Sequence, residues 1–147
     1  MTIDPHTTSR IDDCQLIALE RHHHANGNLT VVEDHSPIPF KLRRAFYLYD
    51  IPGGESRGGH SHHGLYQLLV AISGCFDVMV DDGMNKHRYT LNRPYQGLLV
   101  PPGIWSVLEN FSSGSVCLCL ASEPYSEADY VRDYDDFLTL TASKRES

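Results

Sequence analysis

Turn-forming residues divide the middle of the chain into short apolar segments, and this pattern constrains the fold more than any other feature. The turn signals PGG, SG, DG, RP, PPG and SSG recur at roughly 8- to 12-residue intervals, and Val, Leu, Ile, Tyr and Phe are frequent between them. Such spacing is typical of an antiparallel β-sandwich or barrel. The predicted strands are residues 29–33, 43–50, 66–73, 75–82, 87–92, 97–101, 105–111 and 115–121.

The C-terminal part of the chain follows a helical pattern instead. Ser126 precedes Asp129 by three positions, as in a capping box that opens a helix. The apolar residues that then recur at roughly helical spacing are Ala128, Val131, Tyr134 and Leu138. We therefore predict a short C-terminal helix. A chain of 147 residues fits a single domain, which we place at residues 25–140, between an N-terminal extension (1–24) and a tail (141–147).

Composition excludes several classes of partner. Nineteen acidic and twelve basic side chains give a net charge of −7, which argues against a nucleic-acid binder because such proteins need a basic face. The sequence has neither an apolar leader nor a run of about 18 apolar residues, so we expect a cytoplasmic protein without a membrane partner. The four cysteines form no CxxC pair, and we expect them to be reduced and structural.

Two histidine-rich stretches stand out. The consecutive histidines of RHHH (21–24) cannot all face one way in a strand or a helix, so an exposed loop is expected there. In RGGHSHHGLYQ (57–67), residues two apart on a strand point to the same side. His60 and His62 should therefore face one space together while His63 faces away. Such a pair could hold a metal, move protons, or simply be buried structural histidines.

The spacing around this pair resembles that of the cupin superfamily. The two motifs read Gly59-His60-x-His62-x4-Gln67-x6-Gly74 and Pro101-Pro102-Gly103-x2-Ser106-x3-Asn110. Metal-binding cupins have Glu and His where this chain has Gln67 and Ser106, whose amide and hydroxyl are poor ligands for transition metals. We therefore expect no metal and no other cofactor, which disfavours a metal-dependent cupin oxygenase or isomerase. Without a metal, the two imidazoles keep their own acid and base chemistry near neutral pH.

A narrower resemblance covers roughly residues 25–140. The stretches that carry it are IPFKLRRAFYLYD, SRGGHSHHGLYQLLVAISG, VDDG, VPPGIW and ASEPYSEADYVRDYDDF, which together look like the WxcM-like sugar 3,4-ketoisomerases. The resemblance implies a cupin-type jelly-roll barrel, a homodimer, and isomerisation of dTDP-4-keto-6-deoxyglucose in deoxyaminosugar biosynthesis, as for lipopolysaccharide or S-layer glycans. Two departures favour the alternative of a catalytically silent nucleotide-sugar-binding cupin or a partner protein of a biosynthetic enzyme. Ser106 stands where the family commonly has His or Arg, and Asn26 where its D-x-RG-x-L pattern has Arg.

The resemblance also implies roles for individual residues in the reaction. Moving a carbonyl from C4 to C3 of a hexose requires removal of the C3 proton, a 3,4-enediol, and return of a proton at C4. We assign His60 as the base at C3 and His62 as the partner that shuttles or donates the proton. Tyr47 is a candidate hydroxyl donor into the same cavity, or else a packing residue.

Substrate binding needs cations for the diphosphate and a wall for the sugar. Arg57 and Arg44 are the candidate phosphate ligands, because the guanidinium fork matches phosphate oxygens. Trp105 is expected to line the sugar or base pocket, or else to belong to the core. Gln67 and Ser106 are expected to face the sugar. Because Ser106 cannot act as an acid near pH 7, the configuration of the product at C4, galacto or gluco, stays open.

Overall fold

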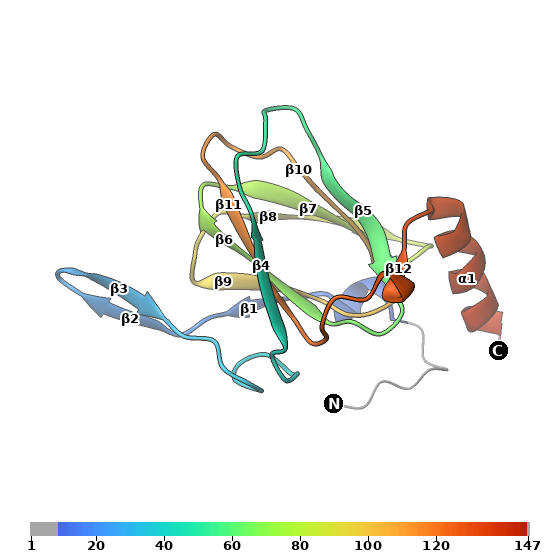
Figure 1. Cartoon of the computed structure of the whole chain (residues 1–147), viewed down its shortest axis with the longest axis horizontal. Coiled ribbons are helices and arrows are strands. Elements are labelled where there is room, and N and C mark those ends of the chain that lie inside the picture. Colours follow the sequence, from blue (N-terminus) through green and yellow to red (C-terminus); the bar gives the residue numbers. More distant parts are fainter. Residues whose placement is uncertain (1–8, 147) are drawn as a thin grey trace.

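Two five-stranded antiparallel sheets enclose the core of the protein, seen here in a computed structural model that describes residues 9–146 (Figure 1). In order across the first sheet, the strands are β1 (Gln15–Ala18), β9 (Gln96–Val100), β6 (Gln67–Ser73), β11 (Val116–Ala121) and β4 (Arg44–Leu48). In order across the second, they are β12 (Tyr130–Val131), β5 (Arg57–His62), β10 (Trp105–Glu109), β7 (Phe76–Asp81) and β8 (Lys86–Leu91). One helix, α1 (Tyr134–Glu146), follows, so the predicted all-β barrel with a C-terminal helix is confirmed.

Alternating side chains build the core between the sheets. In β7, Phe76, Val78 and Val80 are each at most 1% exposed, which confirms the face predicted from the sequence. Leu69 of β6 and Cys117 of β11 belong to the same apolar cluster and face them from the first sheet. A second cluster forms on the outside of that sheet, where the loop after residue 30 packs Ile38 and Phe40 over it. A cavity lined by residues of both sheets lies next to this core.

A hairpin projects from the barrel, at the left of Figure 1. It consists of β2 (Arg21–His24) and β3 (Gly27–Thr30), so the exposed loop predicted at 21–24 is wrong in structure, although all four side chains are exposed as expected. The strand predicted at 29–33 is also wrong, because pairing ends at Thr30 and only an isolated bridge at Glu33 follows. Both faces of the hairpin are in solvent, so no alternation of apolar and polar residues marks its strands.

The described chain is structured beyond the predicted domain bounds. Residues of β1, before position 25, pair with β9 at the edge of the first sheet, and α1 continues past position 140. The bounds 25–140 stay a prediction, and residues 1–8 and 147 of the predicted extension and tail lie outside the described residues. Within the described part of the chain, no helix is long and apolar enough to cross a membrane. The four cysteines are free: three are buried and Cys75 is half-buried.

The segment predicted to start the C-terminal helix folds differently. Residues Glu127–Asp129 form a 3-10 turn (η2), the two residues of β12 pair with the end of β5, and α1 begins only at Tyr134. The Ser126 side chain makes no capping bond. Asp129 instead points its carboxylate at β5, so tertiary contacts override the local capping pattern. The predicted start of the helix is therefore wrong.

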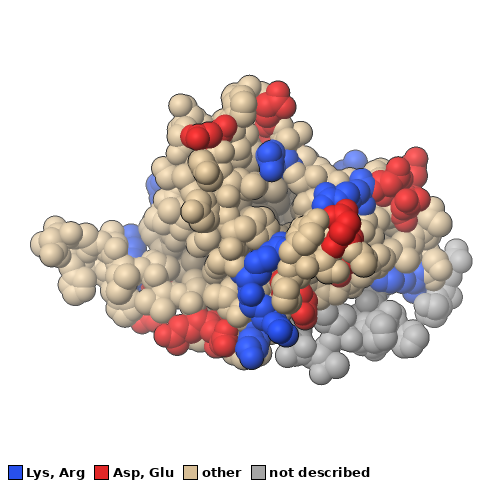
Figure 2. All heavy atoms as spheres, viewed as in Figure 1, with Lys and Arg blue, Asp and Glu red and all other residues tan. Residues whose placement is uncertain are grey.

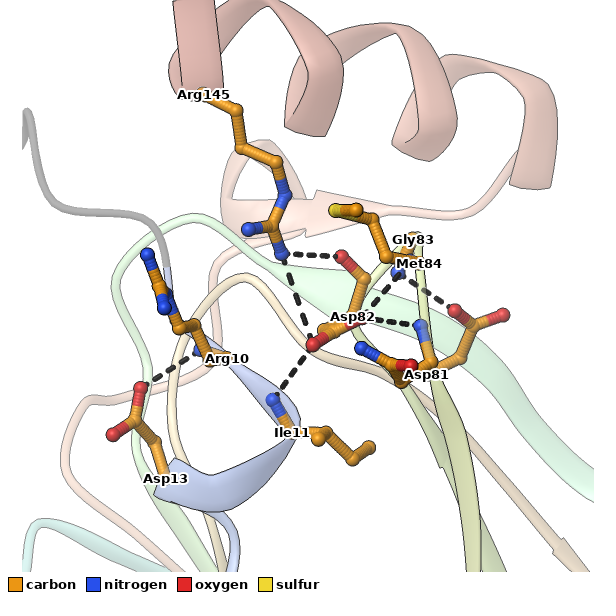
Figure 3. Close-up of polar contacts among 9 residues, drawn as sticks. Arg10, Ile11, Asp13, Asp81, Asp82, Gly83, Met84 and Arg145 are labelled. Carbon is orange, nitrogen blue, oxygen red and sulfur yellow. Dashed lines mark hydrogen bonds and ion pairs between the residues drawn. The ribbon is translucent and has the colours of Figure 1, made fainter.

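Buried Asp82 joins its own β7–β8 turn to two distant segments, the turn near residue 11 and α1 (Figure 3). Its Oδ2 accepts the backbone N–H of Ile11 at 2.8 Å, from the turn η1 (Ile11–Asp13), and its Oδ1 accepts those of Met84 and Asn85. Arg145, near the end of α1, donates Nη2–H to the Asp82 carbonyl at 3.0 Å. Burial opposes ionisation of Asp82, but these backbone donors outweigh it and lower its pKa. The contact fixes α1 against the β7–β8 turn.

Candidate active site

A cavity of about 430 Å³ opens between the two sheets. Its apolar wall includes Phe46 and Leu69. Of the residues predicted to form the site, four line it: Arg57, His60, Gln67 and Ser106. These four come from β5, β6 and β10, so the barrel brings the two sequence motifs to one place.

The glycines of β5 allow it to approach β10 closely. His60 lies across from Ser106, and the pairing shifts at a bulge immediately afterwards. Gly58 has φ +95°, and a Cβ there would lie 3.1 Å from the Ser106 carbonyl oxygen. Only glycine fits both the backbone conformation and the space. The RGG sequence thereby places His60 at the cavity.

The two histidines of β5 face each other as predicted. Their ring centroids are 4.9 Å apart in an edge-to-face arrangement, whereas His63 is exposed on the other side. Tyr130 of β12 packs against both rings, with centroids 5.0 Å from His60 and 4.4 Å from His62. His62 is only 5% exposed and, unlike His60, is not among the residues that line the cavity.

Asp129 holds His62 in place. Its Oδ2 lies 2.9 Å from Nδ1 of His62, and its Oδ1 accepts the backbone N–H of Gly64 at 2.8 Å. The backbone carbonyl of Asp129 also accepts the N–H of His63 at 2.9 Å. Because an ionised carboxylate can only accept, the proton of neutral His62 belongs on Nδ1, and Nε2 keeps a free lone pair.

The surroundings keep both imidazoles neutral at pH 7. Burial, followed by the neighbouring His62, lowers the pKa of His60 to about 4. Burial also lowers the pKa of His62, although the hydrogen bond to Asp129 offsets part of the effect. Nδ1 of His60 is buried and makes no hydrogen bond of good geometry within the described chain, though the nearby Gly58 carbonyl slightly favours its protonation.

Besides His62, the predicted site residues outside the cavity lining are Tyr47, Trp105 and Arg44. Tyr47 is 62% exposed on the outer face of β4 and does not line this cavity, because its neighbours Phe46 and Leu48 take the inward positions. Trp105 does not line this cavity either, since Ser106 next to it points inward.

Trp105 and Arg44 have other contacts. The Trp105 ring packs against Tyr134 and Phe137 of α1, with centroids 5.2 and 5.6 Å apart. These contacts place Trp105 between β10 and α1. Arg44 lies beside the cavity rather than lining it, with its guanidinium carbon 4.6 Å from the centroid of the Phe46 ring and its Nε buried without a hydrogen bond.

Sequence reasoning missed three residues of the C-terminal segment: Asp129, Tyr130 and Arg132. Tyr130 and Arg132 line the cavity, and Arg132 forms a two-point ion pair with Glu127, with N–O distances of 2.6 and 3.0 Å. The Arg132 guanidinium also lies 4.2 Å from the centroid of the Tyr130 ring. The stretch DYVRDYDDF was part of the family resemblance. Because it was interpreted as a helix, its residues were not considered as part of the site.

Basic side chains gather on the face that carries β4, β5 and β12, although the chain as a whole is acidic (Figure 2). Arg57 and Arg132 line the cavity and Arg44 adjoins it. The described residues contain no group of three or more His, Cys, Asp or Glu side chains placed to hold a metal ion. The arrangement is thus a pair of neutral imidazoles next to guanidinium groups, which suits proton transfer on an anionic ligand.

Comparisons with known proteins identify the family of this barrel. The family described as "FdtA: WxcM-like, C-terminal" matches residues 12–142. A TDP-4-oxo-6-deoxy-α-D-glucose-3,4-oxoisomerase of Aneurinibacillus thermoaerophilus is 42% identical over 113 residues, which cover 77% of this chain and 81% of the relative.

Two solved structures are also similar. A 3,4-ketoisomerase from Helicobacter canadensis has a TM-score of 0.86 and 35% identity, covering 88% of this chain and 98% of that one. A variant of the 3,4-ketoisomerase QdtA from Thermoanaerobacterium thermosaccharolyticum, in complex with TDP-4-keto-6-deoxyglucose, has a TM-score of 0.88 and 30% identity, covering 91% and 97%. The chain belongs to the WxcM-like, C-terminal family.

Proposed function

We propose that this protein is a sugar 3,4-ketoisomerase that moves the keto group of dTDP-4-keto-6-deoxyglucose from C4 to C3 without a metal. The observation that carries the proposal is the pair of neighbouring imidazoles, 4.9 Å apart, at a cavity with guanidinium groups. Relatives that act on the TDP-linked 4-keto sugar support the choice of substrate. The product would serve deoxyaminosugar biosynthesis, and a cytoplasmic location stays part of the proposal.

The surroundings of the histidines suggest how they share the proton transfer. Asp129 stabilises the imidazolium that forms when His62 takes a proton, whereas burial and the neighbouring ring disfavour a charged His60. We therefore propose that Nε2 of His62 takes the proton from C3 and returns it at C4. Neutral His60 donates a hydrogen bond to the enediolate oxygen at C4; the hydroxyl proton leaves O3 and a proton is gained at O4, so that the keto group ends at C3. The order expected from the sequence, with His60 as the base, becomes the alternative.

The diphosphate requires cations at the mouth of the cavity. Arg57 and Arg132 line the cavity, and we propose that both contact the phosphate oxygens, with Arg44 nearby adding to the positive field. Arg132 would exchange the Glu127 carboxylate for phosphate, because both acceptors fit the guanidinium fork. Gln67 and Ser106 remain the proposed contacts of the sugar.

Deuterium uptake tests the function directly. Incubation of the protein with dTDP-4-keto-6-deoxyglucose in D2O should label the sugar and yield the 3-keto isomer, identified by NMR. The NMR spectrum of the product also gives its configuration at C4. Tight dTDP binding with neither exchange nor 3-keto product would support the second candidate, a catalytically silent nucleotide-sugar-binding protein, which Ser106 favours because it cannot supply an acid at the sugar.

We further propose that the protein is a homodimer. The outer face of the first sheet exposes Tyr47 (62%), Tyr49 (60%) and Ile72 (46%), and the projecting hairpin exposes Leu29 (58%). In the described chain β4 has a neighbour on one side only, so its other edge is open to pairing. Sedimentation equilibrium should give twice the chain mass, and Tyr47→Arg should shift the protein toward monomer; a monomeric wild-type protein would refute this part of the proposal.

A further inference from the structure

We infer that Asp129 is a positioning residue, which fixes the tautomer and orientation of His62 so that Nε2 is the nitrogen that exchanges a proton. This inference rests on the proposed ketoisomerase function and assigns a role to a residue that the function alone does not. The hydrogen bond from Nδ1 of His62 to Oδ2 of Asp129, 2.9 Å long, carries it.

The carboxylate is itself held at two further points. Its second oxygen accepts the Gly64 N–H at 2.8 Å, and its backbone carbonyl accepts the His63 N–H at 2.9 Å. Both donors follow His62 in the chain, so Asp129 is hydrogen-bonded to the turn after β5 as well as to the imidazole ring. A carboxylate with one oxygen engaged by the backbone has little freedom to rotate, and the other oxygen is left aimed at Nδ1.

The ring has little freedom to turn over. His62 is 5% exposed, and its ring lies 4.4 Å from that of Tyr130 and 4.9 Å from that of His60, measured between centroids. A ring flipped about the Cβ–Cγ bond would present Cδ2 instead of Nδ1 to Asp129 and would lose this hydrogen bond. Packing and the hydrogen bond therefore select the same state, with a proton on Nδ1 and a lone pair on Nε2.

Replacement of Asp129 by Asn should reverse this state with almost no change in shape. The Asn oxygen can still accept from the Gly64 N–H, which leaves the amide NH₂ facing Nδ1 of His62. Nδ1 must then accept, and the proton moves to Nε2. With the wrong tautomer, His62 has no lone pair for the sugar proton, and a loss of about 10²- to 10⁴-fold in kcat is expected by analogy with the Asp of a Ser-His-Asp triad.

The first measurement needs no substrate. Long-range ¹H–¹⁵N correlation spectra of ¹⁵N-histidine-labelled protein distinguish the protonated from the unprotonated ring nitrogen. We expect His62 in wild-type protein to have Nε2 unprotonated, and Asp129→Asn to have Nε2 protonated. An unchanged His62 spectrum in Asp129→Asn would overturn the inference, whatever the reaction of the wild-type protein proves to be.

The second measurement is kinetic. Asp129→Asn should lower kcat by the stated factor while KM and dTDP affinity stay within about threefold, and Asp129→Glu should restore part of kcat because it keeps an accepting carboxylate. Asp136→Asn, which removes an equal charge from an exposed site on α1, is the matched control and should behave as wild type. Wild-type kcat in Asp129→Asn, or equal losses of stability and dTDP binding in both Asp129 variants, would overturn the inference. Absence of both deuterium exchange and the 3-keto product with wild-type protein would refute the proposed function but leave the tautomer result standing.

Discussion

Ser106 in β10 lies directly across from His60 in β5. This pairing joins two sequence motifs that are more than 40 residues apart along the chain, and both residues line the same cavity. At position 58 any residue larger than glycine would crowd the Ser106 carbonyl, so glycine is needed for the two strands to approach closely at the adjacent bulge. The barrel thus presents its histidines next to a hydroxyl, where a metal-binding cupin has an imidazole.

The ion pair between Glu127 and Arg132 predicts that replacing the two residues changes the affinity for dTDP in opposite directions. If phosphate displaces Glu127 from the guanidinium, Glu127→Gln removes a competitor and should tighten dTDP binding by about two- to fivefold, in keeping with the weakness of exposed pairs. Arg132→Gln should weaken binding by about tenfold or more. Isothermal titration calorimetry measures both.

A control pair of the same charge type lies outside the cavity lining. Glu109→Gln removes the half-buried carboxylate 2.9 Å from Arg88; neither residue lines the cavity, and the change should leave dTDP affinity unchanged. Weaker binding in Glu127→Gln would contradict the exchange, because it would make Glu127 a support for Arg132 rather than its competitor.

Asp82 should contribute strongly to stability. Asp82→Asn replaces one accepting oxygen with an NH₂ group, so at least one backbone N–H of η1 or of the β7–β8 turn loses its partner in a buried place. A loss of about 1–3 kcal/mol in the free energy of unfolding is expected from urea titration. Asp12→Asn, an exposed carboxylate in η1, should change it by less than about 0.5 kcal/mol. Equal effects would show that overall charge, not this contact, matters.

The low pKa of His60 predicts a pH dependence of stability. In the folded protein His60 titrates near pH 4, and in the unfolded chain near 6.5, so between these values the unfolded state binds more protons. The contribution of neutral His60 is fully present above about pH 6.5 and is lost as the pH falls toward 4. Carboxylates with lowered pKa, such as Asp77, lose their contribution mainly below about pH 3.8.

Urea unfolding of wild-type protein and His60→Gln from pH 7 to 4 separates the two effects. The free energy of unfolding should fall less steeply with decreasing pH in the variant than in wild-type protein. Parallel curves over this interval would mean that His60 titrates normally in the folded state.

The sequence predicted the core strands well because a strand that is buried on one face alternates apolar and polar residues, and this pattern is visible in the local sequence. Phe76, Val78 and Val80 alternate with less buried residues in β7, and the pairing of His60 with His62 follows from the same period of two. Tyr47 shows the limit of this reasoning. The sequence indicates that Phe46 and Tyr47 face opposite ways, but two adjacent aromatic residues do not reveal which one faces the cavity.

The C-terminal segment shows a different limit. Ser126 and Asp129 have the spacing of a capping box, and Asp129 would accept a backbone N–H in either structure. The structure of this segment is decided by a distant partner, because Asp129 binds His62, which is 67 residues away in the chain. No local pattern contains that contact. The helix was therefore predicted too early, and the contribution of Tyr130 and Arg132 to the cavity was missed with it.

The exchange of the sugar proton is the most direct test of the account. Wild-type protein in D2O should introduce deuterium into dTDP-4-keto-6-deoxyglucose, and His62→Asn and His60→Asn should each reduce the rate by about 10²-fold or more, with dTDP affinity nearly unchanged. Exchange at the wild-type rate in both variants, or loss of dTDP binding in parallel with exchange, would contradict the assignment of the two imidazoles to proton transfer.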